Sequence, residues 1–114
     1  MPSVRQNKAS SLIQRELSLI FQRESRNLFK SALISVTKVR MSPDLKVARV
    51  YLSLFGKENP QDLLADVRRQ QGNVRRLLGI DLKHQLRYIP ELNFFLDDSL
   101  DYAEEIDALL NNDD

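Results

Sequence analysis

The sequence predicts an α+β domain in which helices pack on one face of a mixed three-stranded sheet. Three observations predict this fold class: helical hydrophobic spacing in three stretches, two β-branched runs joined by a turn signal, and a short apolar run after a proline. About 30 residues of predicted helix separate the last two strands, so a tight turn cannot join them. The expected order is helix, strand, strand, helix, helix, strand, followed by a short terminal helix.

The first half of the chain predicts one helix and one hairpin. An amphipathic helix is expected over roughly residues 8–25, after a polar arm over residues 1–9 that we expect to be frayed. Residues 33–40 and 46–55 are predicted to pair as a β-hairpin around the turn signal Ser42-Pro43-Asp44. In the second strand, one alternating face is apolar enough to meet the helices: Ala48, Val50, Leu52 and Leu54.

The second half begins with a clear helix start. Asn59 is a candidate N-cap and Pro60 suits the first helical position. Helical spacing then continues to about Tyr88, where Pro90 stops it. Because an interior glycine costs a helix about 1 kcal/mol, we expect a kink or two helices meeting near Gly72.

The end of the chain predicts a third strand over residues 91–97 and a short acidic helix that Ser99 could cap. At most one of Phe94 and Phe95 should lie deep in the core, since neighbouring side chains alternate across a strand; the other is expected under the terminal helix. Residues 1–110 are expected to form a single domain, and residues 111–114 to be disordered.

Charge is distributed unevenly. Residues 97–114 hold eight acids and no Lys or Arg, so residues 1–96 carry all 17 basic side chains against eight acids. A basic body with an acidic end is typical of nucleic-acid binders, although protein partners also select it. No apolar run approaches a membrane span and there is no secretory signal, so we expect a soluble, cytoplasmic protein.

Residues 67–86 combine an apolar stripe with a basic one. Arg69, Arg76 and Lys83 recur every seven residues, on the side of the predicted helix opposite the stripe that contains Val67, Val74 and Leu78. Asp66 and Asp81 are the only nearby acids, too few to neutralise the row. We therefore expect the row to contact RNA phosphates, with these residues as its members: Arg68, Arg69, Gly72, Arg75, Arg76, Lys83 and Arg87.

Other residues have both a binding and a structural interpretation. Lys38, Arg40 and Lys46 form a second candidate RNA-binding group on the hairpin, although charges on an edge strand also discourage aggregation. Gly72 is expected first to break the helix, and it also allows a phosphate to approach the backbone; the two roles are compatible. Tyr51 and Tyr88 are expected at the margin of the core, with base stacking as the alternative.

The sequence offers little for catalysis or metal binding. It has no cysteine, and His84, the one histidine, has no acid at ligand spacing. The acids after residue 96 lack the glycine and alternating ligands of a calcium loop. No nucleophile–base pair or phosphate-cradling glycine loop is present, so we expect neither an enzyme nor a cofactor.

Two stretches resemble the bacterial ribosome-binding factor A family, whose fold is a type II KH-like domain. They are Val39-Arg-Met-Ser-Pro-Asp-Leu-Lys-Val-Ala-Arg-Val-Tyr51 around the hairpin, and Arg76-Leu-Leu-Gly79 continuing through Leu86-Arg-Tyr-Ile-Pro-Glu-Leu-Asn-Phe-Phe-Leu-Asp-Asp-Ser-Leu100. The family has Ala-x-Gly at the helix junction. Here Gln70-Gln71-Gly72 keeps the glycine and replaces the alanine.

The resemblance implies a non-catalytic assembly factor that binds free small ribosomal subunits and precursor ribosomal RNA and assists late maturation and 5′-end processing. It also implies release by a partner GTPase, and we expect a monomer. The alternative is a protein-interaction module of the same fold that uses its basic face on acidic partners.

Overall fold

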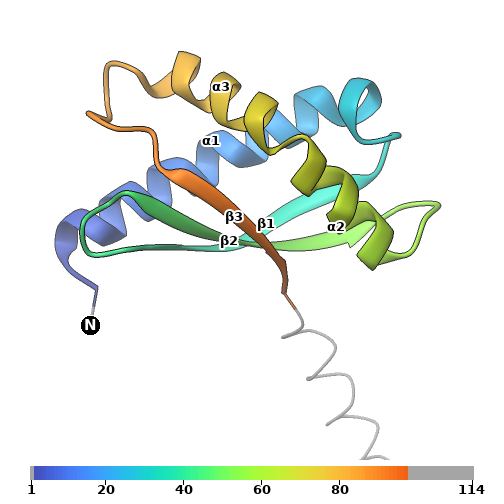
Figure 1. Ribbon diagram of the computed structural model, residues 1–114, viewed down its shortest axis with the longest axis horizontal. Helices are drawn as coiled ribbons and strands as arrows, with labels where there is room; N and C mark the ends of the chain where they lie inside the picture. The colour runs from blue at the N-terminus through green and yellow to red at the C-terminus, as the bar shows by residue number, and fades with distance from the viewer. Residues whose placement is uncertain (1, 98–114) are drawn as a thin grey trace, which may run out of the picture.

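One mixed sheet of three strands, in the spatial order β1-β2-β3, organises the fold. A computed structural model describes residues 2–97 (Figure 1). β1 pairs antiparallel with β2, and β2 pairs parallel with β3, so the predicted fold class is confirmed. The elements are α1 (Val4–Leu28), β1 (Leu33–Met41), β2 (Val47–Phe55), α2 (Pro60–Arg69), α3 (Gln71–Leu82) and β3 (Glu91–Leu96).

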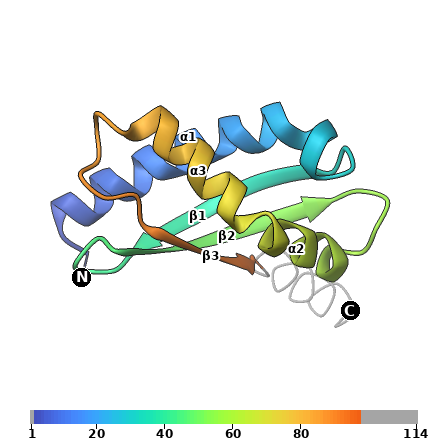
Figure 2. The same ribbon diagram turned by 45° about the horizontal axis from the view of Figure 1, so that its top comes forward.

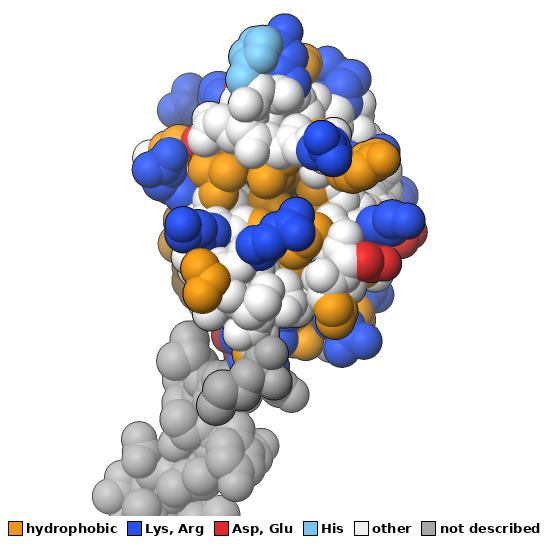
Figure 3. Space-filling model, turned by 90° about the vertical axis from the view of Figure 1, so that its left-hand side faces the viewer, with side chains coloured by type: hydrophobic (Ala, Val, Ile, Leu, Met, Phe, Trp, Pro, Cys, Tyr) orange, Lys and Arg blue, Asp and Glu red, His pale blue; other side chains and the backbone are white. Residues whose placement is uncertain are grey.

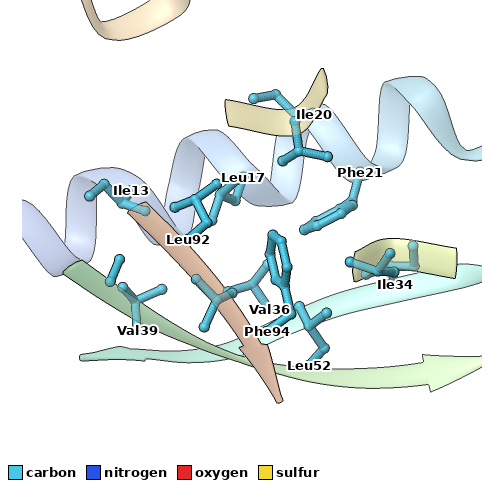
Figure 4. Packing of buried hydrophobic residues seen from close by; sticks show 14 of the residues in the cluster. Ile13, Leu17, Ile20, Phe21, Ile34, Val36, Val39, Leu52, Leu92 and Phe94 are labelled. Carbon is cyan, nitrogen blue, oxygen red and sulfur yellow. The ribbon is translucent and has the colours of Figure 1, made fainter. Parts of the chain in front are cut away.

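All three helices lie on the same face of the sheet, and the other face is not covered by any described element (Figure 2). The predicted apolar face of β2 is buried, with Ala48, Val50 and Leu52 fully inaccessible. Figure 4 shows Phe94 pointing from β3 toward Phe21 on α1, and their rings meet edge to face at 6.0 Å. The core therefore lies between α1 and the sheet, with α2 and α3 closing it over β3.

The start of α1 differs from the prediction. The helix begins at Val4, so a frayed arm over residues 1–9 is wrong. Ser3 caps the helix: its side chain accepts from the Gln6 N–H, and its own N–H donates to Gln6 Oε1 at 2.7 Å. This Ser-x-x-Gln capping box satisfies two backbone donors that would otherwise leave the first turn unstable.

Glutamines of α1 bind the edge strand β1. Gln6 Nε2 donates to the Met41 carbonyl at 3.0 Å. Gln14 Nε2 donates to the Val36 carbonyl at 3.1 Å, where the pairing register between Val36 and Lys38 shifts. A bulge leaves backbone groups unpaired, and Gln14 satisfies one of them.

The predicted junction between two helices is confirmed, but glycine does not form it. α2 starts as expected, with Asn59 Oδ1 accepting from the Asp62 N–H at 2.9 Å. The chain bends at Gln70, which has φ −93° and ψ 10° and ends one helix while beginning the next. Gly72 lies in the first turn of α3 and has no positive φ. Its role as a helix breaker is therefore wrong.

The second helix of this pair ends earlier than predicted. α3 stops at Leu82, and residues 83–90 form a loop rather than a helix to Tyr88. The Glu91 N–H donates to the Lys46 carbonyl at 2.8 Å, which fixes the start of β3 beside the start of β2. Since the chain must reverse from the end of α3 to reach that point, the remaining residues cannot continue the helix.

Only one of Phe94 and Phe95 lies deep in the core, as predicted; the predicted cover of the other by a terminal helix falls outside the described residues. Phe94 is 2% exposed, whereas Phe95 is 37% exposed on the open face of the sheet. The predicted terminal helix and the predicted disordered end lie outside the described residues. None of the helices within residues 2–97 is long and apolar enough to cross a membrane.

These neighbouring phenylalanines give a test of the core. Phe94→Ala should lower the free energy of unfolding by about 3–5 kcal/mol, because the packed ring leaves a cavity. Phe95→Ala should cost only about 1 kcal/mol, the loss of its exposed ring pair. Urea denaturation followed by circular dichroism measures both.

Phe94→Leu keeps most of the volume and should still fold, at a cost below about 1.5 kcal/mol. Equal losses for Phe94→Ala and Phe95→Ala would contradict this placement of the core.

Candidate nucleic-acid interface

Part of the predicted basic row lies on the exposed face of α3. Val74, Leu78 and Leu82 are buried. At about 100° per residue, Gly72, Arg76 and Lys83 fall on the opposite side of the helix. Within the described residues, Arg76 and Lys83 have no ion pair or side-chain hydrogen bond. Both cations therefore remain available to a partner.

Two members of the predicted row instead hold the structure together. The Arg68 guanidinium donates twice to the Phe94 carbonyl, from Nε at 3.1 Å and Nη2 at 2.8 Å. Arg75 donates from Nε to the Pro90 carbonyl at 3.1 Å and from Nη2 to the Ile89 carbonyl at 2.8 Å. Because both guanidinium groups already bind backbone carbonyls, fewer cations of the predicted row are free to bind phosphates.

Arg69 is paired inside the protein. Its guanidinium contacts the carboxylate of Asp66, which is only 8% exposed. Lys30 Nζ lies 3.8 Å from the same carboxylate and 2.7 Å from Glu58 Oε1. The Arg69 side chain remains 70% exposed. Its charge is nevertheless partly neutralised by a buried acid, so it attracts an anion less strongly than Arg76 does.

The hairpin cations lie on a different surface from α3. Lys38 and Arg40 alternate with buried residues of β1 and face away from the helices. Arg40 is directly opposite Arg49 of β2, a like-charge pair that costs the sheet stability. Lys46 lies in the hairpin turn. The structure thus places Lys38 and Arg40 on the sheet face opposite α3, and Lys46 in the turn at one end of the sheet.

The open sheet face also contains two aromatic rings whose contact was not predicted from the sequence. Tyr51 and Phe95 are register partners on β2 and β3, with ring centroids 5.6 Å apart. Lys38 Nζ lies 5.0 Å above the Tyr51 ring, and the Arg68 guanidinium lies 6.0 Å from the Phe95 ring. Parallel pairing of β2 with β3 creates this contact, and sequence periodicity within one strand carries no signal for it.

Arg87 lies in the loop after α3 rather than on the helix. It lines a hollow together with Arg5, Lys8 and Tyr88. Tyr88 is 67% exposed, so its predicted place at the margin of the core is wrong. Arg5 and Lys8 were missed as candidates because they belonged to the predicted frayed arm.

The first turn of α3 leaves space for a ligand backbone. A Cβ added at Gly72 would meet nothing within 4 Å, so no packing inside the protein requires glycine there. No side chain caps the N-terminus of α3. The first N–H groups of a helix lack intrahelical partners and favour anions. Gly72 and these amides therefore offer a phosphate close access beside Arg76.

The described residues contain no cluster of side chains that could form a metal site. No three of their His, Asp and Glu side chains come together in a group that could hold an ion. His84 is exposed in the loop after α3. The Ser42 hydroxyl and then the Lys46 backbone N–H lower the pKa of Asp44, which stabilises the hairpin turn in its ionised form.

Known proteins match this chain over nearly its whole length. The family described as ribosome-binding factor A matches residues 5–110. The Cytophaga hutchinsonii ribosome-binding factor A is 46% identical over 111 residues, 97% of this chain and 84% of the relative. That of Chlorobaculum tepidum is 40% identical over 96% of this chain and 91% of the relative.

Solved structures agree with the fold. The crystal structure of ribosome-binding factor A from Thermus thermophilus superimposes with a TM-score of 0.66 at 21% identity, over 80% of this chain and 94% of that one. A homology model of the Thermus thermophilus ribosome-binding factor A, fitted into the cryo-EM map of its 30S complex, gives 0.61 at 27% identity, over 78% of this chain and 91% of that one. By sequence and by fold, the chain belongs to the ribosome-binding factor A family.

Proposed function

We propose that this chain binds free small ribosomal subunits and their precursor ribosomal RNA, and assists late maturation, including 5′-end processing, without catalysing a reaction. Its family supports the ribosomal target, since a relative has been fitted into a map of a 30S complex. The observation that carries RNA contact is the exposed face of α3. Gly72 and Arg76 lie near its uncapped N-terminus, and Lys83 lies on the same face at the other end of the helix.

The mechanism is stoichiometric binding to the RNA backbone. Arg76 and Lys83 supply charge for phosphates, and the first amides of α3 donate hydrogen bonds to one of them. The tethers from Arg68 and Arg75 hold α2 and α3 against β3, so the binding surface is rigid before RNA arrives. A surface that needs no ordering on binding loses less entropy and can hold an immature RNA helix in one conformation.

We further propose that the domain acts as a monomer in the cytoplasm and that an assembly GTPase releases it from the subunit. Residues 1–110 would form the functional unit. Light scattering of the free protein tests the monomer, and nucleotide-dependent release from purified subunits tests the GTPase.

Reversing the two free cations tests the α3 surface. Arg76→Glu with Lys83→Glu should weaken binding to precursor small-subunit RNA at least about tenfold, since each substitution removes a charged hydrogen bond. The log–log dependence of affinity on salt should become shallower by about 0.9 for each duplex phosphate that the variant no longer neutralises. Fluorescence anisotropy at several salt concentrations measures both quantities.

The matched control reverses two exposed cations elsewhere, Arg15→Glu with Lys57→Glu, and should change affinity much less. Equal losses in both double variants would show that only net charge matters. Sedimentation of lysates gives a second readout: the α3 variant should no longer migrate with free small subunits. If the wild type stays associated with ribosomal proteins after RNase treatment, the alternative of an acidic protein partner is favoured.

Substitution of Gly72 separates stability from binding. Gly72→Ala should raise the free energy of unfolding by about 0.5–1 kcal/mol, because alanine favours helix and has space there. It should also lower RNA affinity about fivefold, the cost of about one hydrogen bond, if its methyl group holds a phosphate away from the backbone. Thermal denaturation and anisotropy measure the two effects.

Gly79→Ala is the control within the same helix. Its added Cβ would meet Ile89 Cγ1 at 3.4 Å, an ordinary contact, so affinity should stay unchanged. Unaltered RNA binding by Gly72→Ala would argue against close approach of a phosphate at this point.

A further inference from the structure

A hollow at one end of the molecule is formed by three segments that lie far apart in sequence. They are the first turns of α1, the turn between β1 and β2, and the loop after α3. Figure 3 shows this end, with apolar side chains exposed in a depression and Lys and Arg side chains around it. The hollow encloses about 440 Å³, within the usual range of small-ligand pockets.

The floor of the hollow is apolar. It is contributed by all three segments, and its apolar side chains include Leu12, Met41, Leu45 and Leu86. Met41 is 8% exposed, and the three leucines are half-buried. A concave apolar floor with a few polar groups around it is the usual form of a small-ligand site.

The rim is cationic. Arg5, Lys8 and Arg87 line the hollow, and within residues 2–97 none of them has an ion pair or a side-chain hydrogen bond. The one acid at the rim, Asp44, uses Oδ1 to accept from Ser42 and Lys46 within the turn. The site therefore has an excess of positive charge close to an apolar surface.

This combination selects the ligand class. An apolar floor with an exposed tyrosine fits a flat aromatic ring, and three cations fit phosphates on either side of it. A nucleotide carries both groups. A base in a duplex is stacked and paired, whereas a base in a single strand can swing out and stack on a protein ring. A peptide made of acidic residues alone would satisfy the cations but would leave the floor uncovered.

We propose that this end pocket holds one unstacked nucleotide of single-stranded RNA, with its base between the apolar floor and Tyr88 and its flanking phosphates on Arg5, Lys8 and Arg87. The inference rests on the proposed function only in taking RNA as the ligand. It adds recognition of an unpaired residue, which the row on α3 does not provide because that row contacts backbone alone.

The test compares two RNA hairpins that differ by one residue. One has a single-nucleotide bulge of 2-aminopurine, and the other is fully paired. The wild type should bind the bulged hairpin more tightly, and the 2-aminopurine fluorescence should change on binding. Tyr88→Ala should weaken binding to the bulged hairpin about tenfold, the loss of one stacked base, and leave the paired hairpin unaffected. Tyr88→Phe should restore both the preference and the fluorescence change.

Control variants test whether the effect is specific to the pocket. Phe55→Ala removes another aromatic ring that is 75% exposed, and Arg15→Ala removes a cation of α1 outside the hollow. Neither should alter the preference for the bulge. Lys8→Ala should weaken binding to the bulged hairpin more than to the paired one. Circular dichroism verifies that the variants fold. Because Tyr88 is exposed, its substitution should not unfold the protein.

Several results would overturn the proposal. These are equal affinity of the wild type for the two hairpins, equal losses on both hairpins in Tyr88→Ala, or displacement of the bulged RNA by a poly-glutamate peptide at the pocket. Binding of free uridine monophosphate as tight as that of the bulged RNA would instead assign a free nucleotide. Loss of paired-hairpin binding in the α3 variant tests the proposed function separately.

Discussion

The outer edge of β3 is the point on which the rest of the structure depends. Arg68 donates to the Phe94 carbonyl, and Gln71 donates to the Leu92 carbonyl two residues earlier. Arg75 binds the carbonyls of the two residues just before the strand. Side chains on either side of the helix junction thus replace the neighbouring strand that β3 lacks. They fix α2 and α3 against the sheet, and they determine which cations stay free.

Sequence patterns predicted the elements well and their ends less well. Alternation in β2 and helical spacing in α3 were predicted correctly because burial directly imposes both periods. The end of α3 was missed because it is set by the pairing of Glu91 with Lys46, a contact between residues far apart in the chain. The start of α1 carried a local signal, Ser3 and Gln6, that could have been recognised.

The candidate site was less predictable for a physical reason. An arginine donates equally well to a phosphate and to a backbone carbonyl, and sequence spacing does not distinguish them. Arg68 and Arg75 bind carbonyls, whereas Arg76, one residue further along α3, does not. The alternation of β2 predicted which of its residues face the helices, but the relation of the hairpin cations to α3 was not predicted. Lys38 and Arg40 lie on the sheet face opposite α3, so they do not extend the row on that helix.

Side chains cover both edges of the sheet. On β1, Gln6 and Gln14 occupy the carbonyls of Met41 and Val36, as Arg68 and Gln71 do on β3. An unprotected edge strand can recruit a strand from another chain, which leads to domain swapping or fibrils. Here an incoming strand would have to displace hydrogen bonds already made by the helices. The open face of the sheet can therefore display aromatic rings and cations to a partner while its borders resist self-association.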